Sequence, residues 1–587
     1  MKFKSEIEAA IKQAVSKLYG LDLDPSVEHP KDERFGDYAT SVALSIGQQT
    51  DADPVEIAHQ LAQTIANYQL PIIKSAEVAE PGFINFWLKE EMLIKEVSLI
   101  NGVKPRRSDK TSEVGVPAGA SGDRYGSSEV GKGRTVVLDY SAPNVAKRFG
   151  IGHLRSTVIG QALYNLGKFH GFKVIGDNHL GDWGTQFGAL LAQIRKSKSK
   201  IRDLTVDKLE ELYVEFHKKA DQDPKLMDEA REWFLKLESG DKEAREIWQA
   251  VVEVSKKEFD RIYALLGIRF DYSYGESFYE DKMPAVIAEV RSKGLSRKSD
   301  GAEIVEFENL PPAILVKSDG TTTYFTRDLA TIKFRLEKWK PQFITYEVGA
   351  DQKLHFQQVF EAAKKLGWGE GCHFFHVAHG LIRLPAQAGL PAGKMSTRLG
   401  QTIKLEDVLE EAIARAKKLT GGDDEISRSV GVGAIKYFDL SHQPQTDIMF
   451  DWEKLFLLEG NSAPYLQYTY ARARSVLEKA RSGGSVVRWS GGSVTKQLNN
   501  QTTEQPLLRW LYRFPESLDT AAENYSPNLV CNYLFELAQR FNSFYAKAPI
   551  LKAEKDQREL RLALTAATAQ VIKNGLSILG IDAPEKL

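Results

Sequence analysis

The sequence predicts a multidomain α/β protein in which a parallel sheet lies between a small α+β domain and an all-α domain. At 587 residues, the chain is long enough for about three to four domains. From Thr135 onward, short β-rich runs alternate with segments of helical periodicity, a pattern typical of a doubly wound parallel sheet. From about residue 405 to the end, almost every segment has helical periodicity.

Residues 1–107 are predicted to form the α+β domain. An amphipathic helix opens it, and further helices are expected near 38–48 and 54–66. In the run 82–88, Phe, Asn and Trp alternate with Ile, Phe and Leu. This period of two predicts a strand that closes the domain.

A segment rich in Gly and Ser, residues 108–134, follows this domain. Its residues 108–133 include six glycines and five serines but no Leu, Ile, Phe or Trp. Such a composition cannot bury a core, so we expect a flexible linker or a long loop.

The parallel-sheet domain is expected to cover residues 135–404. Besides a first strand at 136–138, strands are predicted at 174–175, 343–348 and 374–378, and the run 354–366 predicts the helix between the last two. In such sheets, ligands bind beyond the carboxyl ends of the strands.

Helical sequence interrupts and follows this domain. An insertion is predicted at about 195–320, because 195–265 is dense in charge and helical in period, and we expect it to pack on the edge of the sheet. After it come a helical junction at 405–460 and a helical domain at 461–587.

Composition limits the class of protein. A hydrophobic content of 42% and a charged content of 27% indicate a soluble globular protein, and no apolar run has the ~20 residues of a membrane helix. The amphipathic N-terminus lacks the apolar core of a signal peptide, and two cysteines exclude a disulfide framework, so we expect a cytoplasmic protein. With a net charge of -1, a nucleic acid would be held by local patches; residues 461–587 carry 16 Lys and Arg against 11 Asp and Glu.

The segment 143–153 is the first candidate site. It follows a β-rich run at 136–138 and precedes a helical stripe that begins at Leu154. Backbone N–H groups at a helix N-terminus bind anions, and Gly150 and Gly152 would let a phosphate approach. A tight turn with a capping histidine is the alternative. The segment reads Pro143, Asn144, Val145, Ala146, Lys147, Arg148, Phe149, Gly150, Ile151, Gly152, His153.

Three further groups of functional side chains are expected at strand ends or loops of the same domain. They are 179–186, 324–328 and 394–398. Each has a plain alternative: a packed turn around Trp183, a helix-surface pair of Tyr324 with Asp328, and a solvated loop. Their occurrence in order within one α/β domain favours a single site.

Together these motifs resemble those of class I aminoacyl-tRNA synthetases. Residues 150–153 are similar to the HIGH motif of that class, and 394–398 to its KMSKS loop. The forms Ser-x-Pro-Asn-x-Ala-Lys, Gly-His-Leu-Arg-Ser-Thr, Leu-Gly-Asp-Trp-Gly-x-Gln-Phe-Gly and Lys-Met-Ser-Thr-Arg resemble the arginyl family in particular. Phe35-Gly-Asp-Tyr-Ala39 and Gly82-Phe-Ile-Asn85 are similar to its N-terminal domain. Pro464-Tyr-Leu-Gln-Tyr468 and Phe541-Asn-Ser-Phe-Tyr545 are similar to its anticodon-binding domain.

The resemblance implies a Rossmann-like catalytic domain that joins L-arginine to ATP and then transfers arginine to tRNA(Arg). Such catalysis needs positioning and stabilised phosphate charge, not a nucleophile. The implied catalytic residues are Lys147, His153, Lys394 and Arg398, and the implied ATP-binding residues are Gly150, Gly152, His153, Lys394, Met395 and Ser396. Mg²⁺ is expected with ATP, without an all-protein cage.

For arginine, the resemblance implies acidic partners, because carboxylates match the fork of a guanidinium. Asp139, Tyr324 and Asp328 would surround it, and burial of Asp139 at a strand end would be costly without a cation. Asn144 and Gln352 would hold the amino-acid end. A pocket of this kind rejects neutral analogues, so no editing domain is expected.

The resemblance also implies three contacts with tRNA. The N-terminal domain would hold the corner of the molecule, the catalytic domain its acceptor end and the C-terminal domain its anticodon. Bases stack on aromatic rings, for which the candidates are Tyr465, Tyr468, Phe541 and Tyr545, although a plain core position is the favoured alternative for each.

One departure from the family pattern leaves an alternative open. Gly150 replaces the first histidine of the HIGH motif, so a non-catalytic relative that binds only tRNA or arginine is the rival hypothesis. The retained His153, Lys147, Asn144, Asp328 and Lys394 argue against it. A cysteinyl enzyme is disfavoured because two cysteines are too few for its zinc site. We expect a monomer.

Overall fold

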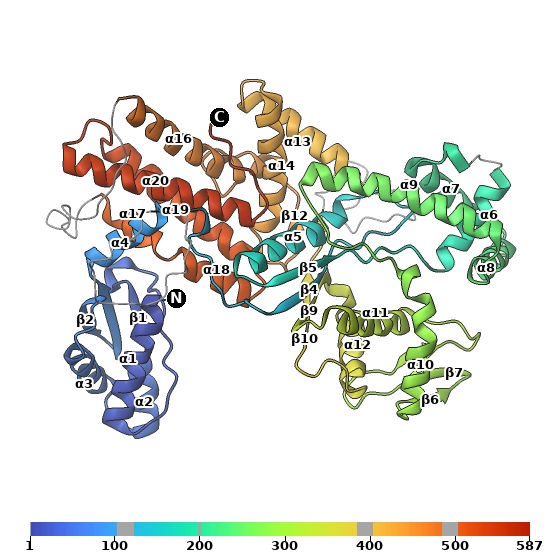
Figure 1. The fold of residues 1–587 in the computed structure, drawn as a ribbon, viewed down its shortest axis with the longest axis horizontal. Coiled ribbons are helices and arrows are strands. Elements are labelled where there is room, and N and C mark those ends of the chain that lie inside the picture. Colours follow the sequence, from blue (N-terminus) through green and yellow to red (C-terminus); the bar gives the residue numbers. More distant parts are fainter. Residues whose placement is uncertain (1, 103–121, 198–200, 384–402, 484–502) are drawn as a thin grey trace.

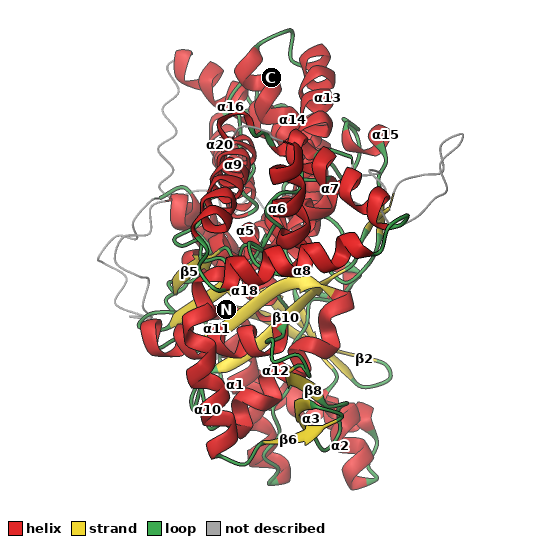
Figure 2. Ribbon diagram, turned by 90° about the vertical axis from the view of Figure 1, so that its right-hand side faces the viewer, coloured by secondary structure: helices red, strands yellow, loops and turns green. Residues whose placement is uncertain are grey.

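The protein is built around a four-stranded parallel sheet, with the N-terminal domain at one end of the molecule and most of the helices above the sheet (Figure 1). The computed structural model describes residues 2–102, 122–197, 201–383, 403–483 and 503–587. In Figure 2 the helices α13 (Leu405–Leu419), α14 (Asp424–Leu440), α16 (Ala463–Ser482) and α20 (Lys555–Ile578) lie above the strands.

The central sheet has the order β10-β9-β4-β5, and all its pairs are parallel. The chain adds β5 on one side of β4 and later β9 on the other, which creates a topological switch point between β4 and β9. The strands predicted in this domain are confirmed. They are β4 (Thr135–Asp139), β5 (Lys173–Asp177), β9 (Phe343–Gly349) and β10 (His373–His379).

Both faces of the sheet are covered, because alternate strand residues point to opposite sides. Val137, Ile175 and Ile344 belong to one buried cluster, which includes α11 and α12, whereas Leu138 and Val174 belong to another, which includes α5. This arrangement leaves the carboxyl ends of the strands for the site. The covering helices are α5 (Leu154–Phe169), α11 (Tyr324–Trp339) and α12 (Lys353–Lys365).

The helices of the predicted insertion pack on a neighbouring helix, not on the sheet's edge as expected. Ala189 of α6 is buried with Phe216 of α7 and Ala230 of α8, because these amphipathic helices meet through their apolar stripes. Asp271 and Tyr272, which follow the last of these helices, run along β5. The helices are α6 (Thr185–Ser197), α7 (Val206–Ala220), α8 (Lys225–Glu238) and α9 (Lys242–Leu266).

A small antiparallel sheet of order β6-β7-β8 follows, which the sequence did not predict. Its strands have four residues each, too few for a clear period of two. These elements are η5 (Glu276–Lys282), α10 (Met283–Ser292), β6 (Ser296–Ser299), β7 (Ala302–Val305) and β8 (Ala313–Val316).

The N-terminal domain carries an antiparallel sheet of order β1-β3-β2 with helices packed beside it (Figure 1). The prediction of a helix near 38–48 was wrong for its first residues, because residues 38–40 form a strand that pairs with β3 and the helix begins at Val42. The elements are α1 (Lys2–Tyr19), η1 (Glu33–Phe35), β1 (Tyr38–Thr40), α2 (Val42–Thr50), α3 (Pro54–Asn67), β2 (Ile73–Ala79), β3 (Phe83–Leu88) and α4 (Glu90–Ile100).

The described part of the segment expected to be a linker, residues 122–134, is packed rather than free. Tyr125 is buried against Phe514, its hydroxyl donates to Glu96 at 3.0 Å, and Asn574 donates to the Gly122 carbonyl at 2.9 Å. One aromatic anchor and several hydrogen bonds therefore hold a segment that is poor in large apolar residues. The rest of the expected linker, up to residue 121, lies outside the described residues.

The remaining chain is almost entirely helical, as predicted. Ion pairs join it to the N-terminal domain: Arg509 contacts Asp37 at 2.5 Å and Arg540 contacts Glu33 at 2.7 Å. In the described ranges, no helix combines the length and apolar character required to cross a membrane. The further elements are β11 (Ile382–Arg383), β12 (Ile448–Met449), α15 (Trp452–Leu455), α17 (Gln505–Leu511), α18 (Phe514–Glu523) and α19 (Asn528–Lys547).

Candidate active site

The segment 143–153 lies between β4 and α5, beyond the carboxyl end of the central strand. The loop contains three non-glycine residues of positive φ: Ser141, Ala142 and Ala146. Such conformations persist only where the surroundings hold them, and they cluster at functional sites. Here the Ala142 N–H donates to Asn178 Oδ1 at 3.1 Å and the Ala146 N–H to Ser255 Oγ at 3.0 Å.

The structure brings the second motif, 179–186, directly beside the first. The Val145 N–H donates to the Gly181 carbonyl at 3.0 Å, and the Gly181 N–H donates to the Pro143 carbonyl at 3.1 Å. Trp183 is fully buried against Phe234, so for this residue the packed-turn reading holds. The motif therefore supports the loop through its backbone.

His153 ends a single 3-10 turn, Ile151–His153, that leads into α5. The Gly150 N–H donates to its Nδ1 at 3.3 Å, which places the ring proton of the neutral imidazole on Nε2. Burial lowers the pKa of His153 to about 4, and the nearby charge of Lys147 adds to this effect. At neutral pH, His153 thus offers an N–H donor at the start of a helix, where anions bind.

We predict that the His153 ring titrates near pH 4 in the folded protein. Its resonance, assigned by its loss in His153→Gln, can be followed in the NMR spectrum of histidine-labelled protein. Lys147→Ala removes the neighbouring charge and should raise this pKa. Titration of His153 near the unperturbed value of about 6.5 would contradict the description of a desolvated imidazole.

Gly150 itself needs no glycine conformation, because its φ of -87° and ψ of 163° are ordinary extended values. Its backbone forms an isolated bridge with Lys404. The neighbouring Arg148 is directed away from the motif, toward Asp207 at 2.9 Å and Glu210 of α7. The substitution at 150 therefore leaves the local backbone regular.

Asp139, a predicted ligand of the substrate guanidinium, is paired inside the protein. Its Oδ2 accepts from Arg335 Nη2 at 2.7 Å, and the same nitrogen donates to Asp177 Oδ2 at 2.8 Å. All three residues are buried. The cation required to compensate the burial of Asp139 is thus Arg335 of α11, and burial no longer argues for a substrate cation at this carboxylate.

Tyr324 is the first residue of α11 and is 55% exposed. Asp328 lies four residues later, on the second turn of the helix. Its Oδ2 is 2.6 Å from His355 Nε2 of α12. Although burial opposes it, the bond to His355 lowers the pKa of Asp328, and Asp328 raises that of His355. Asp328 is therefore a carboxylate at neutral pH. Gln352, exposed, precedes His355 by three residues.

His355 and Glu276 were not among the residues predicted from the sequence, whereas His179 belongs to the predicted group 179–186. The sequence could have indicated His355, because it lies three residues after the predicted site residue Gln352, a spacing that places two side chains on one face of a helix. His179 lies near both Asp139 and Asp328, and its ring is 5.4 Å from that of Tyr279. Burial raises the pKa of Glu276 to about 8, opposed by Arg327. No sequence pattern marks a carboxylate that becomes buried by folding.

Lys394, Met395, Ser396 and Arg398 lie outside the described residues. The chain that follows them is fixed to the first motif: the Ile151 N–H donates to the Ile403 carbonyl and the Leu405 N–H to the Phe149 carbonyl, both at 3.0 Å. Within the described ranges, no group of three or more His, Cys, Asp or Glu could hold a metal ion.

Of the four aromatic residues proposed for tRNA, two are core residues. Phe541 is fully buried and Tyr465 is 9% exposed, so the expectation of base stacking was wrong for both. Tyr468 and Tyr545 are each 42% exposed, and the guanidinium of Arg472 lies 4.7 Å and 5.1 Å from their ring centroids. These three side chains form a cationic aromatic surface.

Three family descriptions match consecutive parts of the chain. "tRNA synthetases class I (R), catalytic domain" matches residues 118–452, "Arginyl tRNA synthetase N terminal domain" matches 5–88, and "DALR anticodon binding domain" matches 466–587.

Full-length relatives agree with these matches. The arginine–tRNA ligase of Chloroflexus aggregans is 41% identical over 96% of this chain and 95% of its own, and that of Clostridioides difficile is 37% identical over all of both. Two solved arginyl-tRNA synthetases share the fold: that of Plasmodium falciparum (TM-score 0.81, 24% identity, covering 100% of this chain and 99% of its own) and that of Thermus thermophilus (TM-score 0.79, 23% identity, covering 100% of both). The chain belongs to the arginyl-tRNA synthetase family.

Proposed function

We infer that the protein is an arginine–tRNA ligase, which attaches L-arginine to tRNA(Arg) at the expense of ATP. Relatives of this name match over the full length, with no part of the catalytic region missing. The carrying observation is that an ionised carboxylate, Asp328, and the N–H donor of His153 belong to the same carboxyl-end face of one sheet. The carboxylate of Asp328 suits a guanidinium, and the N–H donor of His153 suits a phosphate.

Two transfers make up the reaction. First, a carboxylate oxygen of arginine attacks the α-phosphorus of ATP; an O–P bond forms and the bond to the bridging oxygen breaks, which releases pyrophosphate. Then the terminal ribose hydroxyl of the tRNA attacks the carbonyl of the adenylate and AMP leaves. No covalent bond to the enzyme is formed, so catalysis consists of orientation and stabilised phosphate charge.

We assign His153 and Lys147 to the phosphates of ATP, with Gly150 and Gly152 beneath the nucleotide. Lys394 and Arg398, with Met395 and Ser396 between them, are proposed to stabilise the departing pyrophosphate. Asp328 and Tyr324 are proposed to bind the guanidinium, and Asn144 and Gln352 the amino-acid end. Asp139 can add one acceptor, since its Oδ1 is buried without a hydrogen bond among the described residues.

Mg²⁺ is expected to enter with ATP. It would be held by triphosphate oxygens and water. We further propose a monomer that works in the cytoplasm.

Tyr468→Ala is predicted to weaken tRNA binding roughly 5-fold or more, because a base–aromatic stack contributes about 1–3 kcal/mol. Filter binding or fluorescence anisotropy with tRNA(Arg) measures it. Tyr213→Ala, an aromatic residue on insertion helix α7, is the matched control and should not change affinity. Equal effects of the two substitutions would exclude the surface around Arg472 as a tRNA contact.

Arginine-dependent exchange between ATP and pyrophosphate, measured with and without tRNA, tests the activity. Exchange is expected with arginine and not with citrulline, whose neutral group offers Asp328 no cation. Absence of exchange under both conditions, with tRNA binding intact, would instead establish the non-catalytic alternative.

A further inference from the structure

Arg155 is a buried arginine in the first turn of α5, two residues after His153. Its side chain is 1% exposed, so its N–H groups need acceptors. Its Nε lies 3.2 Å from Asp439 Oδ2 near the end of α14, Nη2 donates to the Gln443 carbonyl at 3.4 Å and Nη1 donates to the Thr446 carbonyl. The guanidinium thus joins the ATP-binding corner to the end of α14 and to the loop that leads to β12.

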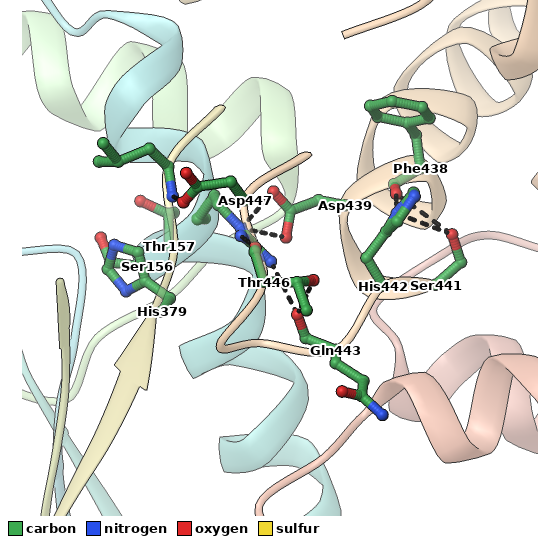
Figure 3. A network of polar contacts seen from close by, with 12 residues as sticks. Ser156, Thr157, His379, Phe438, Asp439, Ser441, His442, Gln443, Thr446 and Asp447 are labelled. Atoms are coloured by element: carbon green, nitrogen blue, oxygen red, sulfur yellow. Dashed lines mark hydrogen bonds and ion pairs between the residues drawn. The ribbon is translucent and has the colours of Figure 1, made fainter. Parts of the chain in front are cut away.

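The carboxylate that receives Arg155 is itself completely buried. Burial raises the pKa of Asp439, and the charge of Arg155 opposes this. A second pair lies close by at the carboxyl ends of two sheet strands, where His379 Nδ1 is 2.8 Å from Glu347 Oε1. Figure 3 shows Asp439, Gln443 and Thr446 in one network, with His379 of β10 across from them.

The loop held by Arg155 carries β12, which pairs in parallel with β11. The Ile448 N–H donates to the Leu381 carbonyl at 2.9 Å, and Asp447 accepts from the Leu381 N–H and from Arg383 Nε, both at 2.7 Å. A Cβ at Gly380 would lie 2.5 Å from the backbone of Thr446, so the two segments fit only because this residue is glycine. Arg155 therefore fixes the β11–β12 pair through residues 443–446.

β11 is the last described element before the sequence that contains Lys394, and its partner strand β12 lies after that sequence. On the far side of that sequence, Ile403 and Leu405 bond to the backbone of the first motif, as described above. The described chain on each side is thus fastened to the motif or to the first turn of its helix. Arg155 provides the fastening on the β11 side.

We propose that Arg155 is a positioning residue for arginine activation, which holds the β11–β12 pair in a fixed place relative to His153. The inference rests on the proposed function. A displacement of about 1 Å between groups that orient a reaction can cost about 10²-fold in rate. Arg155 touches no substrate in this scheme, so its loss should affect the rate of activation and the use of ATP more than the use of arginine.

Arg155→Lys is the first test, because lysine keeps the charge but cannot reach Asp439 and two carbonyls together. The matched control is Arg561→Lys: Arg561 is also buried and donates to Glu504 at 2.7 Å and to the Pro549 carbonyl at 2.8 Å, within the helical domain. Exchange is measured with saturating tRNA, below the thermal midpoint of each variant. We expect Arg155→Lys to lower kcat at least 10-fold with less than 2-fold change in the KM for arginine, and Arg561→Lys to change kcat less than 2-fold.

Two further variants keep the proposal open to refutation if Arg155→Lys does not fold. Asp447→Ala removes an acceptor that is 40% exposed, so it should fold and still lower kcat several-fold. Asp439→Glu combined with Arg155→Lys restores reach to the pair and should recover part of the rate. Normal kcat in Asp447→Ala, or equal losses in Arg155→Lys and Arg561→Lys, would overturn the proposal. Wild-type protein without exchange would instead refute the proposed function.

Discussion

Asp328→Ala is expected to raise the KM for arginine roughly 30-fold or more, while the KM for ATP changes less than about 2-fold. Asp328 is ionised and partly buried, and its only described hydrogen-bond partner is His355 at 2.6 Å. Removal of a desolvated carboxylate costs the charge-assisted bonds that it makes with a guanidinium and leaves that cation unpaired. Steady-state exchange kinetics, with each substrate varied in turn, provide the measurement.

Two companion variants separate charge from shape at this position. Asp328→Asn keeps the size but removes the charge, so it should resemble Asp328→Ala. His355→Ala leaves the carboxylate in place but removes the bond that lowers its pKa, so a smaller effect is expected, and it should grow as the pH falls toward the ordinary pKa of an aspartate of about 4. Equal increases in both KM values would show that Asp328 supports the site as a whole.

The parts of the fold that could be predicted are those with a long, regular pattern. Periodicity and length predict the β-rich runs that end near residues 139 and 177. They also predict the helices of the last domain, whose apolar residues recur at helical spacing. The strands of β6–β8 could not be predicted, because four residues do not establish a period. The prediction of a flexible linker was wrong for residues 122–134, because composition could not show that Tyr125 would pack against Phe514, which is distant in the sequence.

In the candidate site too, the sequence indicated which residues take part but not which residues contact them. Sequence motifs located Asn144, His153 and Asp328 at one face of a sheet. They could not show that Asp139 would be held by Arg335, which is 196 residues away in sequence and reaches the strand end only because α11 packs under the sheet. Nor could they separate Tyr468 from Phe541, because exposure on a helix depends on what packs against it.

His153→Ala is expected to lower the rate of arginine activation about 10²–10³-fold, the usual cost of removing one preorganised donor to a developing oxyanion. The ring is held by the Gly150 N–H and by contact with Phe149, at 5.1 Å between centroids, so its Nε2–H is directed before the substrate arrives. Lys147 should not replace it, because an ammonium on a flexible stem lacks this fixed direction. Single-turnover formation of the adenylate measures the loss.

His153→Gln distinguishes the donor from the ring, since the amide N–H of glutamine can occupy much of the position of Nε2–H. We expect it to restore at least part of the rate lost in His153→Ala, with little dependence on pH between about 5 and 8, because the wild-type ring is already neutral there. Suppose instead that the rate of the wild-type protein fell as the pH rose through about 6.5, and that this fall disappeared in His153→Gln. The active form of His153 would then be the imidazolium. The phosphate would then be held by charge, and the bond from Gly150 to Nδ1 would have to break during activation.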